Sequence, residues 1–277
     1  EQAQMAKAVI VSSNGAETSR LLLLSSSERH PDGLANSSGF VGRNLMFNAH
    51  ATVDGGFEHT LNDYKSDQVS KVIHDIYETD EARGFYGGGG IDARPLWSAT
   101  PIFHAILGMP HDVPGWGAEW KAEIAHNFTR QMTLASGTTS LAMDRNNITL
   151  DPNNTDQWGR PAIRATYRDH DDDLAIARFL SERSQELMDA AGATKYWAHE
   201  IKPSENGVHL LGTARMGDNP ATSVIDRYHR SHDVPNLFIC DGSSFVTSGR
   251  GQPTMTIMAL AFRAAEHIAA AAKANKI

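Results

Sequence analysis

Three groups of residues near the C-terminal end have the types and spacing that could carry chemistry. His209 opens the segment His209-Leu-Leu-Gly-Thr-Ala-Arg-Met-Gly217, Gln252 precedes Pro253, and Asp241-Gly242-Ser243 lies between them. An imidazole titrates near neutral pH, so His209 could take a proton from a hydroxyl group. The amide of Gln252 could hydrogen-bond the same hydroxyl, but it cannot act as a base.

A buried strand and a long helix are predicted to position these side chains. The apolar run 237–240 is typical of a buried strand, and Asp241-Gly242 would form the turn at its end. Pro253 suits the start of a helix, which we expect to extend almost to the end of the chain. The free N–H groups of Thr254 and Met255 would then attract an anionic group.

The first residues predict a strand–turn–helix unit of the α/β kind. Ala8 to Ser12 is an apolar strand, and Asn14-Gly15 is a turn because both residues tolerate positive φ. Residues 16–25 follow as a helix, with Leu21, Leu22 and Leu24 facing a core. A sequence that opens inside a fold in this way leads us to expect an earlier segment. Any targeting signal would lie there, so a cytoplasmic and a periplasmic location both stay open.

The middle of the sequence predicts a mixture of helices, strands and loops. Residues 51–60 alternate weakly, as in a strand, and residues 120–134 read as a helix. The four glycines 87–90 predict a flexible tight loop, which lacks the flanking strand and helix of a phosphate-binding loop. Further along, two strands joined by a loop are predicted at 147–151 and 162–168.

The acidic run His170-Asp-Asp-Asp173 precedes a predicted helix that ends near Ala190. Acidic side chains at a helix start complement the helix dipole. We therefore interpret this run as a cap and not as a metal site.

Composition narrows the classes of function. The net charge of −8 argues against a nucleic-acid-binding surface, which needs clustered Lys and Arg. The one cysteine, Cys240, excludes an intramolecular disulfide and a thiolate zinc site, and we expect it to be an inert core residue. No unbroken apolar run approaches the roughly 20 residues that cross a bilayer, so no membrane span is predicted.

The chemical motifs resemble those of the glucose–methanol–choline (GMC) oxidoreductase family, and specifically its sugar, polyol and glycoside dehydrogenase branch. The family's C-terminal half carries His-x-x-Gly-Thr-x-x-Met-Gly, here residues 209–217, a strand ending in Asp-Gly/Ala-Ser, here 241–243, and a Pro-Thr-x-Thr helix, here from Pro253. The resemblance covers nearly the whole sequence and corresponds to the second half of a family member. Three other segments are similar to family segments: residues 14–22, 41–50 and 149–161.

This resemblance implies an α/β (α+β) fold, with part of an FAD-binding Rossmann-like domain and a substrate domain built on an antiparallel sheet with flanking helices. Residues 1–50 and 206–277 would belong to the flavin domain, and residues 51–205 to the substrate-binding domain. The family's Gly-x-Gly-x-x-Gly loop, which holds the FAD pyrophosphate, is absent from this sequence. The implied partner is therefore a missing N-terminal FAD-binding half, on the same chain or on a separate one.

The implied activity is FAD-dependent oxidation of a hydroxyl on a sugar, glycoside or polyol by hydride transfer to flavin, in a dehydrogenase in preference to an oxidase. His209 would be the base, and Gln252, where the family usually has Asn or His, would orient the hydroxyl. An electron acceptor or a small subunit would be a further partner, and no metal is implied. The implied cofactor-binding residues are Asp241, Gly242, Pro253, Thr254 and Met255.

Alternative interpretations stay open at this point. His209 taken alone could be a structural histidine, Asp241-Gly242 a plain turn, and Gln252 a cap for the following helix. For function, the alternatives are a redox-neutral lyase on the same scaffold and a non-catalytic subunit or fragment that completes a partner chain.

Overall fold

The structure is a computed structural model that describes residues 2–65, 69, 71–94, 108–205, 207 and 209–277. The chain forms two compact units, and each is described here by itself. Unit 1 contains the chain up to Asn48, together with Ser140–Asp169 and Ser204–Ile277. Unit 2 contains Ala49–Thr139 and His170–Pro203.

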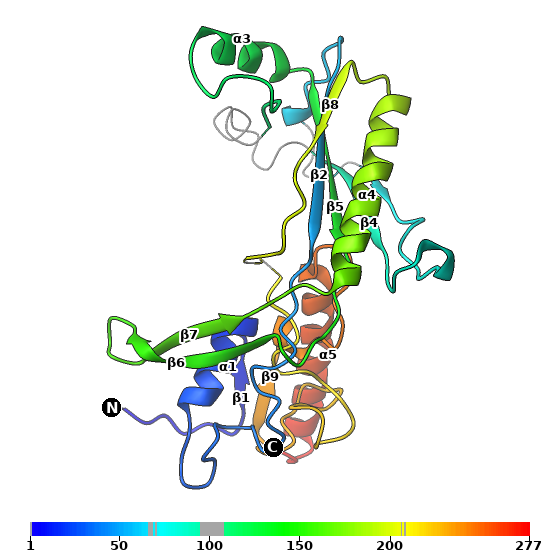
Figure 1. The fold of residues 1–277 in the computed structure, drawn as a ribbon. Coiled ribbons are helices and arrows are strands. Elements are labelled where there is room, and N and C mark those ends of the chain that lie inside the picture. The colour runs from blue at the N-terminus through cyan, green and yellow to red at the C-terminus, as the bar shows by residue number, and fades with distance from the viewer. Residues whose placement is uncertain (1, 66–68, 70, 95–107, 206, 208) are drawn as a thin grey trace. The chain divides into compact units, whose positions relative to one another are not determined.

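Unit 1 is built on a pair of parallel strands, β1 (Val9–Val11) and β9 (Leu237–Ile239), in which Val9 lies opposite Leu237 (Figure 1). The helix α1 (Gly15–Leu24) follows β1 after a tight turn. Asn14 takes φ 117° in that turn, and its side chain accepts hydrogen bonds from the N–H groups of Ala16 and Glu17. The predicted strand–turn–helix unit and the predicted strand before Asp241 are both confirmed.

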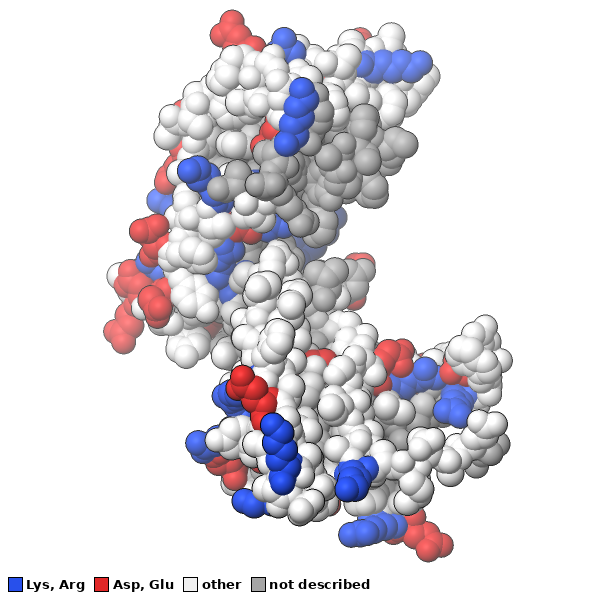
Figure 2. All heavy atoms as spheres, turned by 180° about the vertical axis from the view of Figure 1, so that it is seen from behind, with Lys and Arg blue, Asp and Glu red and all other residues white. Residues whose placement is uncertain are grey.

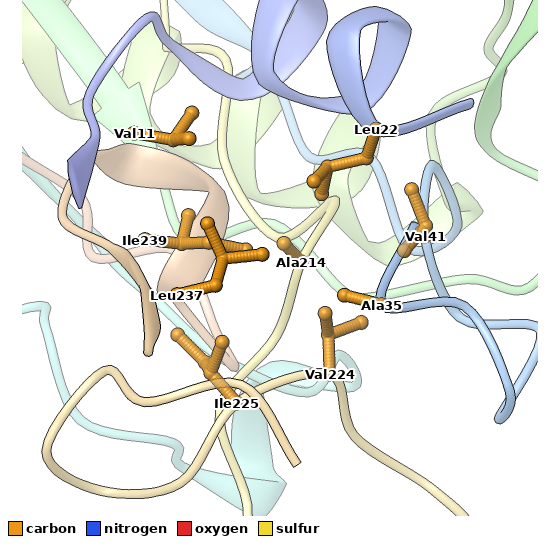
Figure 3. Packing of buried hydrophobic residues seen from close by; sticks show 9 residues of the cluster. All are labelled: Val11, Leu22, Ala35, Val41, Ala214, Val224, Ile225, Leu237 and Ile239. Carbon is orange, nitrogen blue, oxygen red and sulfur yellow. The ribbon is translucent and has the colours of Figure 1, made fainter. Parts of the chain in front are cut away.

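The core of unit 1 lies between these strands and α1. In Figure 3 the side chains of Val11, Leu237 and Ile239 from the strands point toward Leu22 of α1 and Ala214. Leu21 is 45% exposed, so the expectation that it faces a core is wrong. The helix presents a narrower apolar stripe than its run of leucines suggests.

A β-hairpin of strands β6 (Asn147–Thr155) and β7 (Pro161–Thr166) packs on α1 in unit 1. Arg20 of α1 donates to the Asp156 carboxylate at 2.6 Å and to the Pro161 carbonyl at 2.9 Å. The Arg20 guanidinium holds the pKa of Asp156 below its usual range. These contacts place residues 140–169 in unit 1, whereas the sequence-based division put them in the middle domain, 51–205.

The C-terminal helix α5 (Thr254–Lys273) follows a 3₁₀ turn, η3 (Gly242–Ser244), in unit 1. Among the described helices, α5 is long and apolar enough to cross a membrane, by length and composition only. Its apolar residues do not form one unbroken run in the sequence, because Arg263 and Glu266 interrupt the helix. Charged side chains are costly inside a bilayer, which argues against a spanning role for α5.

Unit 2 is a five-stranded sheet in the order β3-β4-β5-β2-β8, with every neighbouring pair antiparallel. One face carries Val53, Ile91 and Leu134, which pack against Ile176 and Leu180 of the helix α4. The expected antiparallel sheet with flanking helices is confirmed. The elements of unit 2 are β2 (His50–Gly56), η1 (Asp63–Lys65), β3 (Lys71–Ile73), η2 (Glu81–Arg83), β4 (Gly89–Arg94), α3 (Ala118–Asn127), β5 (Gln131–Thr138), α4 (Asp171–Ala190) and β8 (Lys195–Ala198).

Two expectations for unit 2 are wrong. The glycines 87–90 do not form only a loop, because Gly89 and Gly90 begin β4. A Cβ on Gly89 would lie 2.5 Å from Leu180 Cδ1, so glycine here allows the helix to approach the sheet. The helix predicted over 120–134 ends at Asn127, and β5 begins at Gln131.

The acidic run before α4 is a helix cap, as predicted. His170 Nδ1 accepts from the Asp172 N–H at 3.1 Å, and Asp173 Oδ2 accepts from the His170 N–H at 3.0 Å. The described residues contain no cluster of three or more side chains suited to a metal ion.

Charged residues of both signs are interspersed on the face of the molecule drawn in Figure 2. No cluster of one sign dominates the described part of this face.

Gly212 holds a backbone position that other residues should not tolerate. Its φ is 89°, and a Cβ there would lie 2.3 Å from the Asn44 carbonyl oxygen. Gly39 is a matched control, because its φ of 71° is also positive but a Cβ would meet nothing within 4 Å. We expect Gly212→Ala to lower the free energy of unfolding by about 3 kcal/mol or more, and Gly39→Ala by about 1 kcal/mol. Urea unfolding measures both, and equal losses would contradict steric contact as the cause.

His229 should make the stability of unit 1 depend on pH. It is 1% exposed, its Nδ1 lies 2.6 Å from the Ile239 carbonyl oxygen, and burial lowers its pKa. The unfolded chain, with an ordinary histidine pKa of about 6.5, then binds the proton more readily than the folded chain. Its contribution is therefore complete above about pH 6.5 and is lost as the pH falls through the lowered pKa.

The variant His229→Asn should lose part of this pH dependence. Asparagine tolerates the positive φ of 67° at this position and does not titrate. We expect the fall in urea midpoint from about pH 7.5 to about pH 5 to be smaller in this variant than in the unaltered chain. The exposed His59→Asn is the control and should leave the fall unchanged.

Candidate active site

A hollow of about 400 Å³ in unit 1 brings together most of the predicted site residues. It lies where the chain leaves β1 and β9 and where α5 begins, and Ser13 and Asn14 line it alongside the predicted residues. Met255 is not among the lining residues, and its side chain is 73% exposed. The predicted residues that line the hollow are His209, Gln252, Asp241, Gly242, Pro253 and Thr254.

His209 is 6% exposed, and its two ring nitrogens contact two amide side chains. Nε2 lies 3.2 Å from Gln252 Oε1, and Nδ1 lies 2.5 Å from Asn48 Oδ1. Gln252 therefore contacts the imidazole. It does not cap α5, because the N-cap position is Pro253 and no side chain caps that helix.

The chain after His209 is held on two sides, which explains the spacing of its motif. Leu211 exchanges backbone hydrogen bonds with Met46 on one side. On the other side Gly212 N–H donates to the Gly242 carbonyl, and the Thr213 hydroxyl donates to the Gly15 carbonyl. The Gly-Thr pair three residues after the histidine thus anchors the segment, and the histidine lines the hollow.

The carboxylate of Asp241 joins the end of β9 to the turn after β1. Oδ2 accepts from the N–H groups of Ser13 and Asn14 at 3.0 and 3.2 Å and from the Thr18 hydroxyl at 2.6 Å. Oδ1 accepts from the N–H and the hydroxyl of Ser243 at 2.8 and 2.6 Å. This is more than a plain turn, and the side chain has its acceptor positions occupied by protein donors.

The first turn of α5 offers free backbone donors to the hollow. The N-cap Pro253 makes no side-chain capping bond, and the first turn contains no acidic residue. The first N–H groups of a helix have no partner within the helix and carry positive partial charge. Thr254 also lines the hollow, so this end of the helix suits an anionic or electron-rich group.

Cys240 lies beside the site but does not suit nucleophilic chemistry. Burial, with a smaller contribution from the Asp241 charge, raises the pKa of its thiol to about 11. The thiol therefore stays protonated at neutral pH, as expected for an inert residue, although it is only partly buried.

Asn48 is the contact of His209 that the motifs did not indicate. It is 3% exposed, and its Nδ2 donates to the Gly249 carbonyl at 2.8 Å and to Ser248 Oγ at 3.2 Å. The pair lies 161 residues apart in the sequence, so no local spacing could predict it. The available signal was that Asn48 lies in residues 41–50, a segment similar to the family.

Residues 142–261 match the family model GMC oxidoreductase. The matched residues include the His209 motif, the Asp241 turn and the start of α5. The chain carries the C-terminal domain of the GMC oxidoreductase family. The resemblance inferred from the motifs is confirmed.

Relatives match along nearly the whole chain. The chain is 37% identical to 2-methyl-1,2-propanediol dehydrogenase of Mycolicibacterium austroafricanum, over 95% of this chain and 48% of that protein. It is 30% identical to the fructose dehydrogenase large subunit of Gluconobacter japonicus, over 95% and 47% of the two chains. It is 28% identical to the gluconate 2-dehydrogenase flavoprotein of Pantoea cypripedii, over 97% and 45%. The chain thus spans less than half the length of these relatives.

The fold is also that of solved GMC-type enzymes. A structure of Aspergillus oryzae RIB40 formate oxidase, concerned with FAD modification, matches with a TM-score of 0.62 at 18% identity, over 96% of this chain and 54% of that one. Alcohol and sugar dehydrogenases are thus among the relatives of this chain, and the GMC family membership indicates FAD as the cofactor.

Because the Asp241 carboxylate connects the end of β9 to the turn after β1, its substitution should lower the stability of unit 1. In Asp241→Asn an amide N–H₂ group would face several of the five protein donors, leaving buried groups without acceptors. We expect the free energy of unfolding to fall by about 2–4 kcal/mol, and the amides of Ser13 and Asn14 to exchange hydrogen faster.

Asp233→Asn is the control for this prediction. Asp233 also accepts from a backbone N–H and a hydroxyl, both of Ser37, at a more exposed site. We expect a loss below about 1 kcal/mol there. Equal losses, measured by urea unfolding, would show that the hydrogen bonds of Asp241 do not specially stabilise the connection between β9 and the turn after β1.

Proposed function

We propose that the chain carries the catalytic residues for oxidation of a hydroxyl group on an alcohol, sugar or polyol, with FAD as hydride acceptor. The observation that carries the proposal is the buried imidazole of His209, with Nε2 next to Gln252 in the hollow at the uncapped start of α5. Bound FAD would supply the two-electron acceptor of the reaction. The protein's part is to bind the hydroxyl, remove its proton and favour negative charge beside α5.

His209 Nε2 is the proposed acceptor of the hydroxyl proton. An imidazole is suited to this because it can be neutral before the step and protonated after it. Gln252, 3.2 Å away, is the proposed partner that hydrogen-bonds the hydroxyl oxygen and limits its orientation.

The proposed cofactor contacts come mainly from the backbone. The N–H groups of Thr254 and Met255 would face the electron-rich edge of the flavin, with Pro253 fixing the start of the helix. Gly242 would allow close approach of the cofactor. Asp241 would contribute backbone atoms and the shape of the turn, because its carboxylate already accepts five hydrogen bonds.

We further propose that a nucleotide-binding segment packs on unit 1 and completes the FAD site. A parallel sheet is normally covered on both faces, yet Val9 and Ile10 of β1 are 45% and 54% exposed. Met255 and Phe262 of α5 are 73% and 71% exposed. Such apolar exposure is typical of a surface that another segment covers.

Unit 2 is the proposed substrate-binding domain, and an electron acceptor or small subunit is a further proposed partner. The fructose dehydrogenase relative is named as a large subunit, which supports a subunit arrangement. Its name and that of the propanediol dehydrogenase favour a dehydrogenase over an oxidase.

The activity can be tested in the chain joined to a nucleotide-binding half, from its own gene or from the propanediol dehydrogenase relative. We expect a yellow protein whose flavin is reduced by one or more alcohols, polyols or sugars. His209→Ala should slow that reduction by about 10²–10⁴-fold while the flavin stays bound, because the hydroxyl proton then has no positioned acceptor. Stopped-flow absorbance of the flavin measures the rate.

The control is His267→Ala, which removes a histidine that stacks on Tyr228 and does not line the hollow. An unchanged reduction rate in His209→Ala would overturn the assignment of the base. Turnover without flavin reduction would favour the lyase, and a complex that never binds flavin would favour the non-catalytic subunit.

A further inference from the structure

Asn48 faces the proposed base directly across an antiparallel bridge. Met46 and Leu211 exchange backbone hydrogen bonds in that bridge. Asn48 lies two residues after Met46, and His209 lies two residues before Leu211. Because side chains alternate along extended chains, the two residues fall opposite each other on one side. Both are more than nine-tenths buried.

The neighbours of Asn48 decide which way its amide points. Its Nδ2 lies 2.8 Å from the Gly249 carbonyl oxygen, which can only accept a hydrogen bond. Ser248 Oγ, 3.2 Å away, already accepts from the Ser140 N–H at 2.8 Å and can accept again. The reversed amide would place two carbonyl oxygens against each other. The nitrogen must therefore face residues 248–249, and the oxygen must face His209.

The amide orientation in turn decides the tautomer of the imidazole. Asn48 Oδ1 lies 2.5 Å from His209 Nδ1 and has no proton to donate. Nδ1 must then carry the hydrogen, and in a neutral ring Nε2 must carry the lone pair. Nε2 lies 3.2 Å from Gln252 Oε1, which cannot donate to that lone pair. In the neutral ring the Gln252 amide therefore turns its N–H₂ to this side or leaves Nε2 to the substrate hydroxyl.

We infer that Asn48 is a positioning residue that holds His209 in the Nδ1–H tautomer and so reserves Nε2 for the substrate proton. The inference rests on the proposed function for its consequence, but the tautomer itself is a property of this chain. The same side chain secures the loop at 248–249, three residues before Gln252. One amide thus fixes both polar groups of the site.

The tautomer can be measured without flavin or substrate. In the chain labelled with ¹⁵N-histidine, the nitrogen shifts and couplings of His209 distinguish the two forms, and His209→Gln assigns its signals. We expect Nδ1–H as the dominant neutral form. Asn48→Ala should make Nε2–H the dominant form, because the acceptor at Nδ1 is lost. Nε2–H in the unaltered chain, or persistence of Nδ1–H in Asn48→Ala, would overturn the inference.

Two further variants separate tautomer control from loop anchoring. Ser248→Ala removes one bond to Asn48 Nδ2 but leaves Oδ1 in place, so Nδ1–H should persist. Asn48→Asp keeps an acceptor beside Nδ1, and Nδ1–H should persist there too. Urea midpoints identify any variant that fails to fold. A change of tautomer in Ser248→Ala, equal to that in Asn48→Ala, would assign the effect to the loop.

In the completed flavoprotein, Asn48→Ala should lower kcat by about 10–100-fold with little change in KM, and Asn48→Asp should recover part of the loss. The tautomer measurement and the flavin-reduction measurement can contradict the positioning role and the proposed function separately. Nδ1–H in the chain without any flavin reduction would refute the proposed function alone. Flavin reduction that needs His209 but not Asn48 would refute the positioning role alone.

Discussion

The buried carboxylate of Asp241 is the interaction on which the architecture of unit 1 depends. Five donors from the turn after β1, from α1 and from the turn after β9 converge on its two oxygens. A buried carboxylate is stable only when its charge is met by such donors. The ends of two parallel strands, which no hairpin joins, are thereby fixed to each other. The hollow exists at this point because both strands end there and α1 and α5 begin nearby.

The segment 209–217, which carries the proposed base, depends on these hydrogen bonds of Asp241 for its position. Gly212 and Ala214 donate backbone hydrogen bonds to carbonyls of Gly242 and Ser243, directly after Asp241. Leu211 pairs with Met46 on the opposite side. The segment is therefore held between a turn that Asp241 stabilises and a chain that carries Asn48. Precision at His209 comes from backbone pairing on both sides, which suits a group that must meet a hydroxyl at hydrogen-bond distance.

The sequence predicted local features well and long-range pairings poorly. The strand at 237–240, the cap at His170 and the grouping of His209 with Gln252 all follow from residue type and motif, and the structure has them. The helix expected over 120–134 is present but ends at Asn127, and its predicted last turn is strand, because Met132 and Leu134 suit a strand face as well as a helix stripe. The contact between Asn48 and His209 joins distant parts of the sequence, and only the antiparallel bridge brings them together.

Glutamine at 252 is compatible with a base whose tautomer is fixed from the other side. When His209 is neutral, the Gln252 amide can turn its N–H₂ toward the Nε2 lone pair, and when His209 is protonated its oxygen can accept from Nε2–H. One uncharged side chain thus serves both states of the base. A second histidine at this position would add another titrating group, and the two protonations would be coupled. With an amide on each side of the ring, His209 is the titrating member of the trio, so proton transfer changes the charge at one defined atom.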